Sequence, residues 1–154
     1  MLISLLISSF SMLYFAQKKA PPLPDEMVLL LPVDGPFLEK QKLPTLSDPF
    51  PANQLTMQQV IQALDYGAKD PRVKGMLIDF RGGGLGFSQV QEIRQAIREF
   101  RATGKFVKAY SQSFGSSGNS FTQYYLAAAA SEIWMQPVGS LAITGISAEL
   151  PFAR

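Results

Sequence analysis

Few side chains in this chain could carry out chemistry, because its 154 residues include no histidine and no cysteine. An imidazole general base, a Ser-His-Asp triad, a Cys-His dyad, a Cys/His zinc site and a disulfide are excluded within this sequence. Proton transfer would have to use Lys, Asp, Glu, Tyr or a chain terminus. We predict no metal and no cofactor. The formal net charge is only +2, without a basic block, so nucleic acid is not a predicted partner.

The first candidate site is a run of glycines, Arg81-Gly82-Gly83-Gly84-Leu85-Gly86. Glycines in a loop between a strand and a helix let backbone N–H groups face an anion or oxyanion without obstruction by a Cβ atom. The loop lacks the Gly-Lys-Ser/Thr ending of a phosphate loop, and Phe87 stands where the dinucleotide pattern needs its last glycine. We predict an oxyanion or peptide-binding role for Gly83 and Gly84, with a tight strand-to-helix turn as the alternative.

The second candidate is the segment 116–120, with the sequence Ser-Ser-Gly-Asn-Ser. A serine at the N-terminus of a helix lies beside backbone donors and could act as a nucleophile. Because histidine is absent, its base would have to be a lysine, and the nearby lysines are Lys105 and Lys108. Ser117 and Ser120 therefore have two interpretations, nucleophile-like residues or helix caps, and we favour caps.

Apolar runs and helical patterns alternate along the chain and would position these loops. Met27–Val33 is almost continuously apolar, which is expected of a strand buried on both faces. Thr56 with Gln59, and Ser88 with Gln91, match capping boxes that begin helices. Strands that alternate with helices indicate an α/β fold with right-handed crossovers and a mainly parallel sheet. The expected strands are 27–33, 75–80, 106–110 and 132–135, and the expected helices follow residues 56, 88 and 120.

Three arginines lie on the predicted helix after residue 88, away from its apolar stripe: Arg94, Arg98 and Arg101. The apolar stripe repeats at helical spacing and should face the core. We expect the arginines to form a solvated surface rather than a ligand site.

Residues 1–16 contain no charged side chain and are followed by Gln17 and two lysines. A run this apolar is typical of a signal peptide or a membrane anchor, although a bilayer span needs about 20 residues. No basic segment precedes it, and Tyr14 spoils a small-x-small cleavage site before Ala16, so we predict an uncleaved transmembrane anchor. The predicted organisation is an anchor over 1–16, a Pro-rich linker over 17–26 and an α/β domain over 27–154.

Several segments also resemble one family, in the same order and with similar spacing. They are the apolar start, the Pro-rich spacer, Met27–Val33 with Asp34-Gly35, residues 70–75, the strand that ends at Phe80-Arg81, the glycine loop, residues 100–105, and Gln123–Ala127 with Glu132-Ile133-Trp134. Together they resemble the first part of signal peptide peptidase A (protease IV, peptidase family S49) of the long double-domain type. The resemblance extends over essentially the whole chain, and the segment from Gln123 to Trp134 is its most specific part.

The resemblance implies a ClpP/crotonase-like spiral of β-β-α units. It also implies a membrane-anchored serine endopeptidase of the Ser-Lys type, which degrades cleaved signal peptides. Its place would be the bacterial inner (plasma) membrane, with the domain on the periplasmic or extracytoplasmic side. The expected partners are signal peptides, the membrane and, in the full-length form, further copies of the same protein.

The same resemblance places the catalytic Lys beyond Arg154, and the nucleophilic Ser in a second half. We therefore expect a partial peptidase domain, truncated at its C-terminus, with no catalytic residue of its own, and whether the chain alone is an enzyme stays open. The alternative is a non-catalytic, membrane-anchored half-domain that oligomerises or binds peptide. A further alternative is a crotonase-type acyl-CoA enzyme with Gly83 and Gly84 as oxyanion donors.

Overall fold

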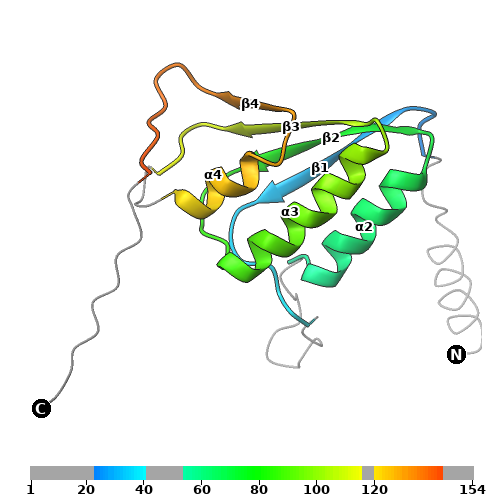
Figure 1. Cartoon of the computed structure of the whole chain (residues 1–154), viewed down its shortest axis with the longest axis horizontal. Coiled ribbons are helices and arrows are strands. Elements are labelled where there is room, and N and C mark those ends of the chain that lie inside the picture. The colour runs from blue at the N-terminus through cyan, green and yellow to red at the C-terminus, as the bar shows by residue number, and fades with distance from the viewer. Residues whose placement is uncertain (1–22, 41–53, 116–119, 144–154) are drawn as a thin grey trace, which may run out of the picture.

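Four parallel strands form a single sheet in the computed structural model, which describes residues 23–40, 54–115 and 120–143. The strands lie side by side in the order of the sequence (Figure 1). Each of the first three strands is therefore followed by a crossover that returns the chain to the next position in the sheet. The strands are β1 (Met27–Val33), β2 (Val73–Phe80), β3 (Phe106–Ser111) and β4 (Glu132–Met135).

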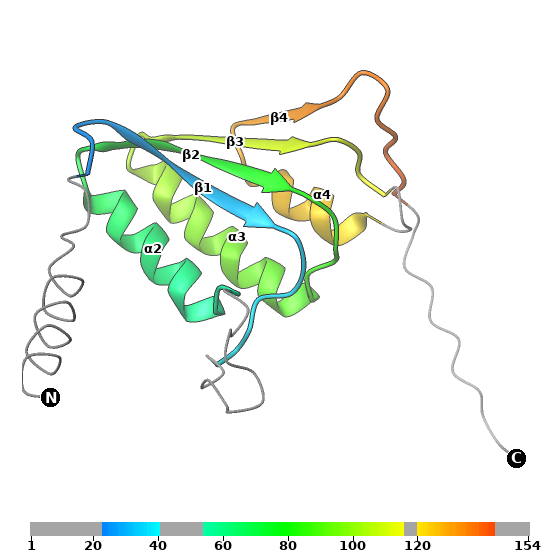
Figure 2. The ribbon, with the colours of Figure 1, turned by 180° about the vertical axis from the view of Figure 1, so that it is seen from behind.

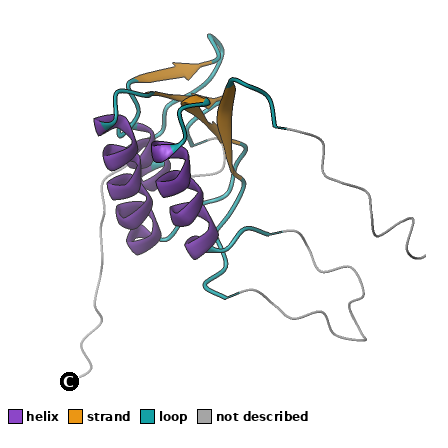
Figure 3. Ribbon diagram, turned by 90° about the vertical axis from the view of Figure 1, so that its right-hand side faces the viewer, coloured by secondary structure: helices purple, strands orange, loops and turns teal. Residues whose placement is uncertain are grey.

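Three helices connect the strands, and all of them lie on the same side of the sheet (Figures 2 and 3). The predicted α/β class with a mainly parallel sheet is therefore confirmed. The predicted order of elements also agrees, although β2 begins two residues earlier than expected. The helices are α2 (Met57–Lys69), α3 (Phe87–Ala102) and α4 (Phe121–Ala127).

The two predicted capping boxes differ in outcome. At α2 the Gln59 N–H donates to Thr56 Oγ1 at 3.2 Å, and the Thr56 N–H donates to Gln59 Oε1 at 2.9 Å, so this capping box is confirmed. The box predicted at Ser88 is wrong, because α3 begins at Phe87 and its N-cap residue is Gly86, which has no side chain to bond with. Gly86 already has an extended conformation, so the first helical turn forms upstream of Ser88.

The hydrophobic core lies between the helices and one face of the sheet. The apolar stripe of α3 is completely buried there, from Val90 to Phe100. It meets alternate residues of the central strands, including Met76, Ile78 and Val107, because successive side chains of a strand point to opposite faces. This alternation explains how β2 and β3 hold the helices in place.

The other face of the sheet is not covered by any of the described residues, as Figure 3 shows. Val28 and Leu30 of β1 are each about half exposed on it. The expectation that Met27–Val33 is buried on both faces is therefore wrong within the described residues. The strand is apolar throughout, but only Leu31 and Val33 are fully buried, while Met27 and Leu29 pack against the core and stay partly exposed.

Two of the three arginines expected to be solvated instead bind the neighbouring helix and the turn after it. Arg94 Nη1 donates to the carbonyl oxygen of Tyr125 at 2.5 Å, and its guanidinium lies 4.3 Å from the centre of the Tyr125 ring. Arg101 Nη1 donates to the Ala129 carbonyl oxygen at 2.6 Å. The prediction of a solvated position is thus wrong for Arg94, which is half-buried, whereas Arg101 is exposed as predicted, although its Nη1 binds a carbonyl group of the turn after α4.

The predicted anchor over 1–16 and the linker up to residue 22 lie outside the described residues. Among the residues that the structure describes, none of the helices is both long and apolar enough to cross a membrane.

Candidate functional site

A cavity of about 450 Å³, called here the strand-end cavity, lies at the carboxyl ends of β2 and β3. The carboxyl end of a parallel sheet is where ligands commonly bind in α/β proteins, because the loops that leave the strands meet there. Residues from β2, the glycine loop, β3 and α4 surround it. Its lining includes Arg81, Gly82, Tyr110, Ser111, Gln112 and Gln123.

The glycine loop has a shape that only glycine tolerates at its centre. The loop is fixed at its start, where the Arg81 N–H donates to the Val33 carbonyl oxygen at 2.9 Å. Gly82 and Gly83 then have φ values of +118° and +73°, which disfavour any side chain. A Cβ atom on Gly83 would also overlap the carbonyl group of Asp34. Gly83 is therefore required both by its backbone conformation and by the close approach of the segment after β1.

The loop is also held by α4, because Gln123 Nε2 donates to the carbonyl oxygen of Gly83. Within the described residues, the N–H groups of Gly82, Gly83 and Gly84 donate to no protein acceptor. These donors are free to bind a carbonyl or carboxylate oxygen of a ligand. The oxyanion or peptide-binding role of Gly83 and Gly84 stays a prediction, and the geometry supplies the donors that this role needs.

The cavity carries one ion pair among neutral hydrogen-bonding groups. Arg81 Nε lies 2.7 Å from Asp79 Oδ2, so the two formal charges offset one another. The Tyr110 hydroxyl accepts from Gln136 Nε2 at 3.2 Å and keeps its own proton available for donation. A lining of this kind fits a peptide, whose amide groups are polar and uncharged.

Of the two candidate serines, Ser120 lies in the described part of the chain, and its hydroxyl does not face a lysine there. Ser120 is only 1% exposed, and its hydroxyl donates to the Ala142 carbonyl oxygen at 2.8 Å. It occupies the N-cap position of α4 but makes no side-chain capping bond. Ser117 lies outside the described residues. Lys108 Nζ pairs with Glu132 at 3.3 Å, on the open face of the sheet.

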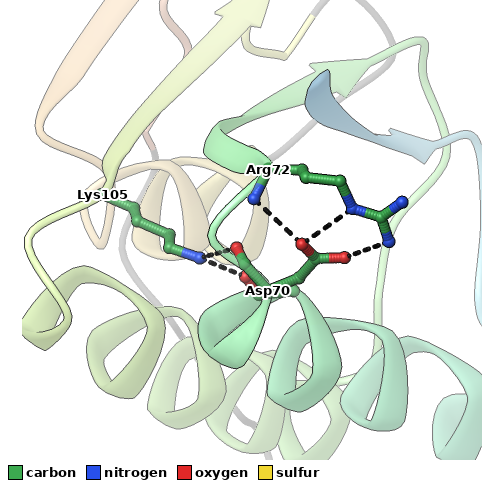
Figure 4. Close-up of polar contacts among 4 residues, drawn as sticks. Asp70, Arg72 and Lys105 are labelled. Atoms are coloured by element: carbon green, nitrogen blue, oxygen red, sulfur yellow. Dashed lines mark hydrogen bonds and ion pairs between the residues drawn. The ribbon is translucent and has the colours of Figure 1, made fainter. Parts of the chain in front are cut away.

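The other candidate lysine, Lys105, belongs to a polar cluster at the amino ends of β2 and β3, opposite the end that carries the cavity (Figure 4). Its Nζ donates to the carbonyl oxygens of Gly67 and Asp70, both at 2.6 Å. Side-chain hydrogen bonds from Arg72, reinforced by the Arg72 backbone N–H, lower the pKa of Asp70 from its usual 3.8 to about 2. These groups satisfy one another and close the turn between α2 and β2, so the cluster is structural.

The sequence predicted a role for Gly83 and Gly84 but none for Gln123, which belongs to one of the segments that carry the family resemblance. Gln123 reaches the glycine loop from 40 residues away in the sequence, so no local pattern could reveal the contact. It also missed an aromatic stack between α3 and α4, in which the rings of Phe87, Phe121 and Tyr125 lie 5.9 to 6.4 Å apart. This stack fixes the position of α4, and therefore of Gln123.

Comparisons with known proteins agree with the resemblance read from the sequence. No model of a protein family matches the chain. Curated proteins do match it, and the chain is similar to part of proteins named Protease 4 and serine protease SPPA. Protease 4 of Haemophilus influenzae is 31% identical over 143 residues, which cover 86% of this chain and 22% of that protein.

Two other relatives have similar names. Protease 4 of Salmonella typhi is 29% identical over 111 residues, or 71% of this chain and 17% of that protein. The chloroplastic serine protease SPPA of Arabidopsis thaliana is 28% identical over 98 residues, or 64% of this chain and 14% of that protein. The chain thus spans about a fifth or less of the length of the relatives it matches.

Proposed function

We propose that this chain is the N-terminal part of a Ser-Lys serine endopeptidase that degrades cleaved signal peptides. Its own contribution would be to bind peptide rather than to cut it. The observation that carries the proposal is the homology to Protease 4 over 86% of the chain. The strand-end cavity supports the peptide-binding role, because Gly82 lines it, Gly83 and Gly84 follow directly in the chain, and their N–H groups, which donate to no acceptor among the described residues, can donate to peptide carbonyl oxygens.

The larger architecture is part of the same proposal. Parallel strands with all their helices on one side are compatible with a ClpP/crotonase-like spiral of repeated units. We further propose that residues 1–16 anchor the protein in the bacterial inner membrane with the domain on the periplasmic side. In the full-length form, several copies would assemble.

The second candidate function is a non-catalytic half-domain that binds peptide or oligomerises at the membrane. It is favoured by the position of Ser120, whose buried hydroxyl bonds to a carbonyl and not to a lysine in the described part of the chain. In both functions peptide would bind at the strand-end cavity. They differ in whether other parts of the protein supply the catalytic Lys and Ser.

Peptide binding and catalysis can be tested together on the full chain in a mild detergent. We expect a fluorescent signal peptide to bind without being cleaved, and a fluorophosphonate to label no serine. Gln123→Ala should weaken binding several-fold, because the Gly83 carbonyl loses its donor and the loop loses its orientation. The matched control is Gln95→Ala on the exposed side of α3, which should bind as the unmodified chain does. Labelling of Ser117 or Ser120, or an unaffected Gln123→Ala variant, would contradict the proposal.

The biological role has a separate test. In cells from which the gene is deleted, cleaved signal peptides should persist longer than in the parent strain, and restoring the gene should reverse this. Equal lifetimes in the two strains would argue for the non-catalytic alternative.

A further inference from the structure

Asp34 and Gly35 form the bend in which the chain leaves β1. Asp34 is exposed, and within the described residues no hydrogen bond or ion pair holds its carboxylate. The Gly35 N–H likewise donates to no acceptor in the described part of the chain. Asp34-Gly35 is also the only aspartate-glycine pair of the sequence, which has no asparagine-glycine pair. The Asp34 carboxyl group and the Gly35 nitrogen are therefore neighbours that no hydrogen bond among the described residues restrains.

An aspartate followed by glycine has the composition that most readily converts to isoaspartate. The Gly35 nitrogen can form a bond to Asp34 Cγ, while the carboxyl hydroxyl leaves with the amide proton as a molecule of water. The product is a cyclic imide. Glycine favours this ring closure, because it has no Cβ atom that obstructs the attack or restricts its backbone. A molecule of water then opens the imide at either carbonyl carbon, so the net mass does not change.

The two ways of opening the imide give different chains. Opening at Cγ restores aspartate, whereas opening at the main-chain carbonyl carbon gives isoaspartate. In isoaspartate the main chain runs through Cβ and Cγ of residue 34, so the Cα atoms of residues 34 and 35 are separated by an additional carbon. The former carbonyl group of Asp34 becomes a free carboxylate. The conversion consumes no oxidant and needs no metal, only water.

The peptide group that would change is the one against which the glycine loop packs. A Cβ atom built on Gly83 would lie 2.8 Å from the Asp34 carbonyl carbon and 2.9 Å from Gly35 Cα. The main chain of Gly83 therefore approaches this peptide group too closely to admit a side chain. Just before this contact, the Arg81 N–H donates to the Val33 carbonyl oxygen at 2.9 Å. A charged carboxylate and a longer main chain at residue 34 would not fit the space that the neutral carbonyl group now occupies.

We propose that Asp34-Gly35 is a site of spontaneous isoaspartate formation, and that this modification displaces the glycine loop from the strand-end cavity. Arg81 and Gly82 line that cavity, so the displaced loop would remove part of its wall. Peptide binding by the chain would then decline with age. The chemical step and the displacement are independent of the proposed function, whereas the loss of peptide binding rests on it.

Isoaspartate can be measured in the full chain, incubated at neutral pH in a mild detergent and in water labelled with heavy oxygen. Trypsin releases residues 20–40 as one peptide, which contains both Asp34 and Asp25. Asp25 also lies exposed in a bend but is followed by Glu26, so it is the internal control. Mass spectrometry should show isoaspartate with labelled oxygen at residue 34 accumulating about tenfold faster than at residue 25.

Gly35→Ala separates the chemistry from the fold. A Cβ atom at Gly35 meets nothing within 4 Å, so the variant should fold and bind peptide as the unmodified chain does. It should form isoaspartate about tenfold more slowly, because the new methyl group crowds the attacking nitrogen. Asp34→Glu is the second variant, since it keeps the carboxylate but would have to close a larger ring. Both variants should retain peptide binding throughout the incubation, whereas the unmodified chain should lose it in proportion to the isoaspartyl fraction.

Hydrogen exchange of the Arg81 N–H reports on the glycine loop without any peptide. This N–H is protected by its bond to the Val33 carbonyl oxygen, and it should exchange several-fold faster in the isoaspartyl form. The Asp70 N–H, which donates to the Tyr66 carbonyl oxygen at the amino end of β2, is the matched control. It should exchange at the same rate in both forms.

Two results would overturn the inference. Isoaspartate that forms no faster at residue 34 than at residue 25 would show that the folded bend prevents ring closure. Isoaspartate at residue 34 with unchanged exchange of the Arg81 N–H would show that the glycine loop does not depend on this peptide group. If the exchange accelerates while peptide binding stays constant, the inference holds and the proposed binding role of the glycine loop fails.

Discussion

β2 and β4 belong to the same sheet and are both rich in apolar residues, yet their surroundings differ completely. β2 pairs with a strand on each side, and its helix-facing residues Met76, Ile78 and Phe80 are almost completely buried. Among the described residues β4 pairs on one side only, and all four of its own residues are exposed. The difference shows that an apolar strand sequence specifies a tendency to be buried, while neighbouring elements decide whether it is buried.

Other pairs of residues in the molecule show the same contrast, because their residue types are similar but their structural surroundings differ. Substitutions at such matched positions can therefore test the comparison, because the sequence pattern is nearly constant within each pair.

The largest effect is expected in the core. Phe100 of α3 is 1% exposed, so Phe100→Ala should lower the free energy of unfolding by about 3 to 5 kcal/mol. Trp134→Ala, which removes an even larger side chain from β4, should change it by about 0.5 kcal/mol or less. Urea denaturation followed by circular dichroism measures both. Equal losses would mean that β4 is covered in solution and would break the comparison.

The glycine loop gives the next largest effect. Gly83→Ala should cost about 1 to 3 kcal/mol, because its φ of +73° is unfavourable for alanine and the new Cβ atom would meet Asp34. It should also weaken peptide binding. Gly84→Ala at the next position meets nothing within 4 Å and should be neutral or stabilise by up to about 1 kcal/mol. Thermal unfolding and peptide titration check both variants, and similar behaviour of the two would contradict the assigned loop geometry.

The elements themselves could be predicted from the sequence because their signals are local. The stripe of α3 and the capping box of Thr56 each depend on residues within a few positions of one another. The contact of Gln123 with Gly83 and the packing of Arg94 on Tyr125 could not be predicted, since they join residues 40 and 31 positions apart. The glycine loop was recognised as a site by its composition, but its partners depend on how α4 packs.

Predictions about burial failed where they assumed a neighbour that the described residues do not contain. The apolar sequence of β1 suggested cover on both faces, yet only one layer of helices is present in the described part of the chain. The exposed residues of β1 and β4 have the composition of an interior strand. Composition alone therefore cannot predict which apolar strand residues stay exposed.

A smaller effect is expected at the two helix starts. Thr56→Ala should cost about 1 kcal/mol, because the N–H of Gln59 loses its acceptor. Ser88 has the same spacing to a glutamine but makes no capping bond, so Ser88→Ala should stay within about 0.5 kcal/mol of the unmodified chain. Chemical denaturation would show the difference, and an equal cost at both positions would mean that α3 begins later in solution than it does here.

The smallest effects concern two carboxylates and depend on pH. Hydrogen bonds from the Arg72 side chain and backbone lower the pKa of Asp70 from its usual 3.8 to about 2. Those from the Trp134 indole and Lys108 lower the pKa of Glu132 below its usual value. A pKa that is lower in the folded state stabilises the protein above the unfolded pKa, and this stabilisation is lost as the carboxylate is protonated.

For Asp70, the loss should therefore occur as the pH falls from about 3.8 to about 2, and Asp70→Asn should flatten the dependence of the urea midpoint on pH in that window. Glu132→Gln should flatten it less, because its two partners, the Trp134 indole and Lys108, are themselves exposed to solvent on the open face of the sheet. Glu132 is exposed and Asp70 is partly exposed, so added salt should reduce both effects. If Glu132→Gln had the larger effect, the β4 edge would be more ordered than its exposure indicates.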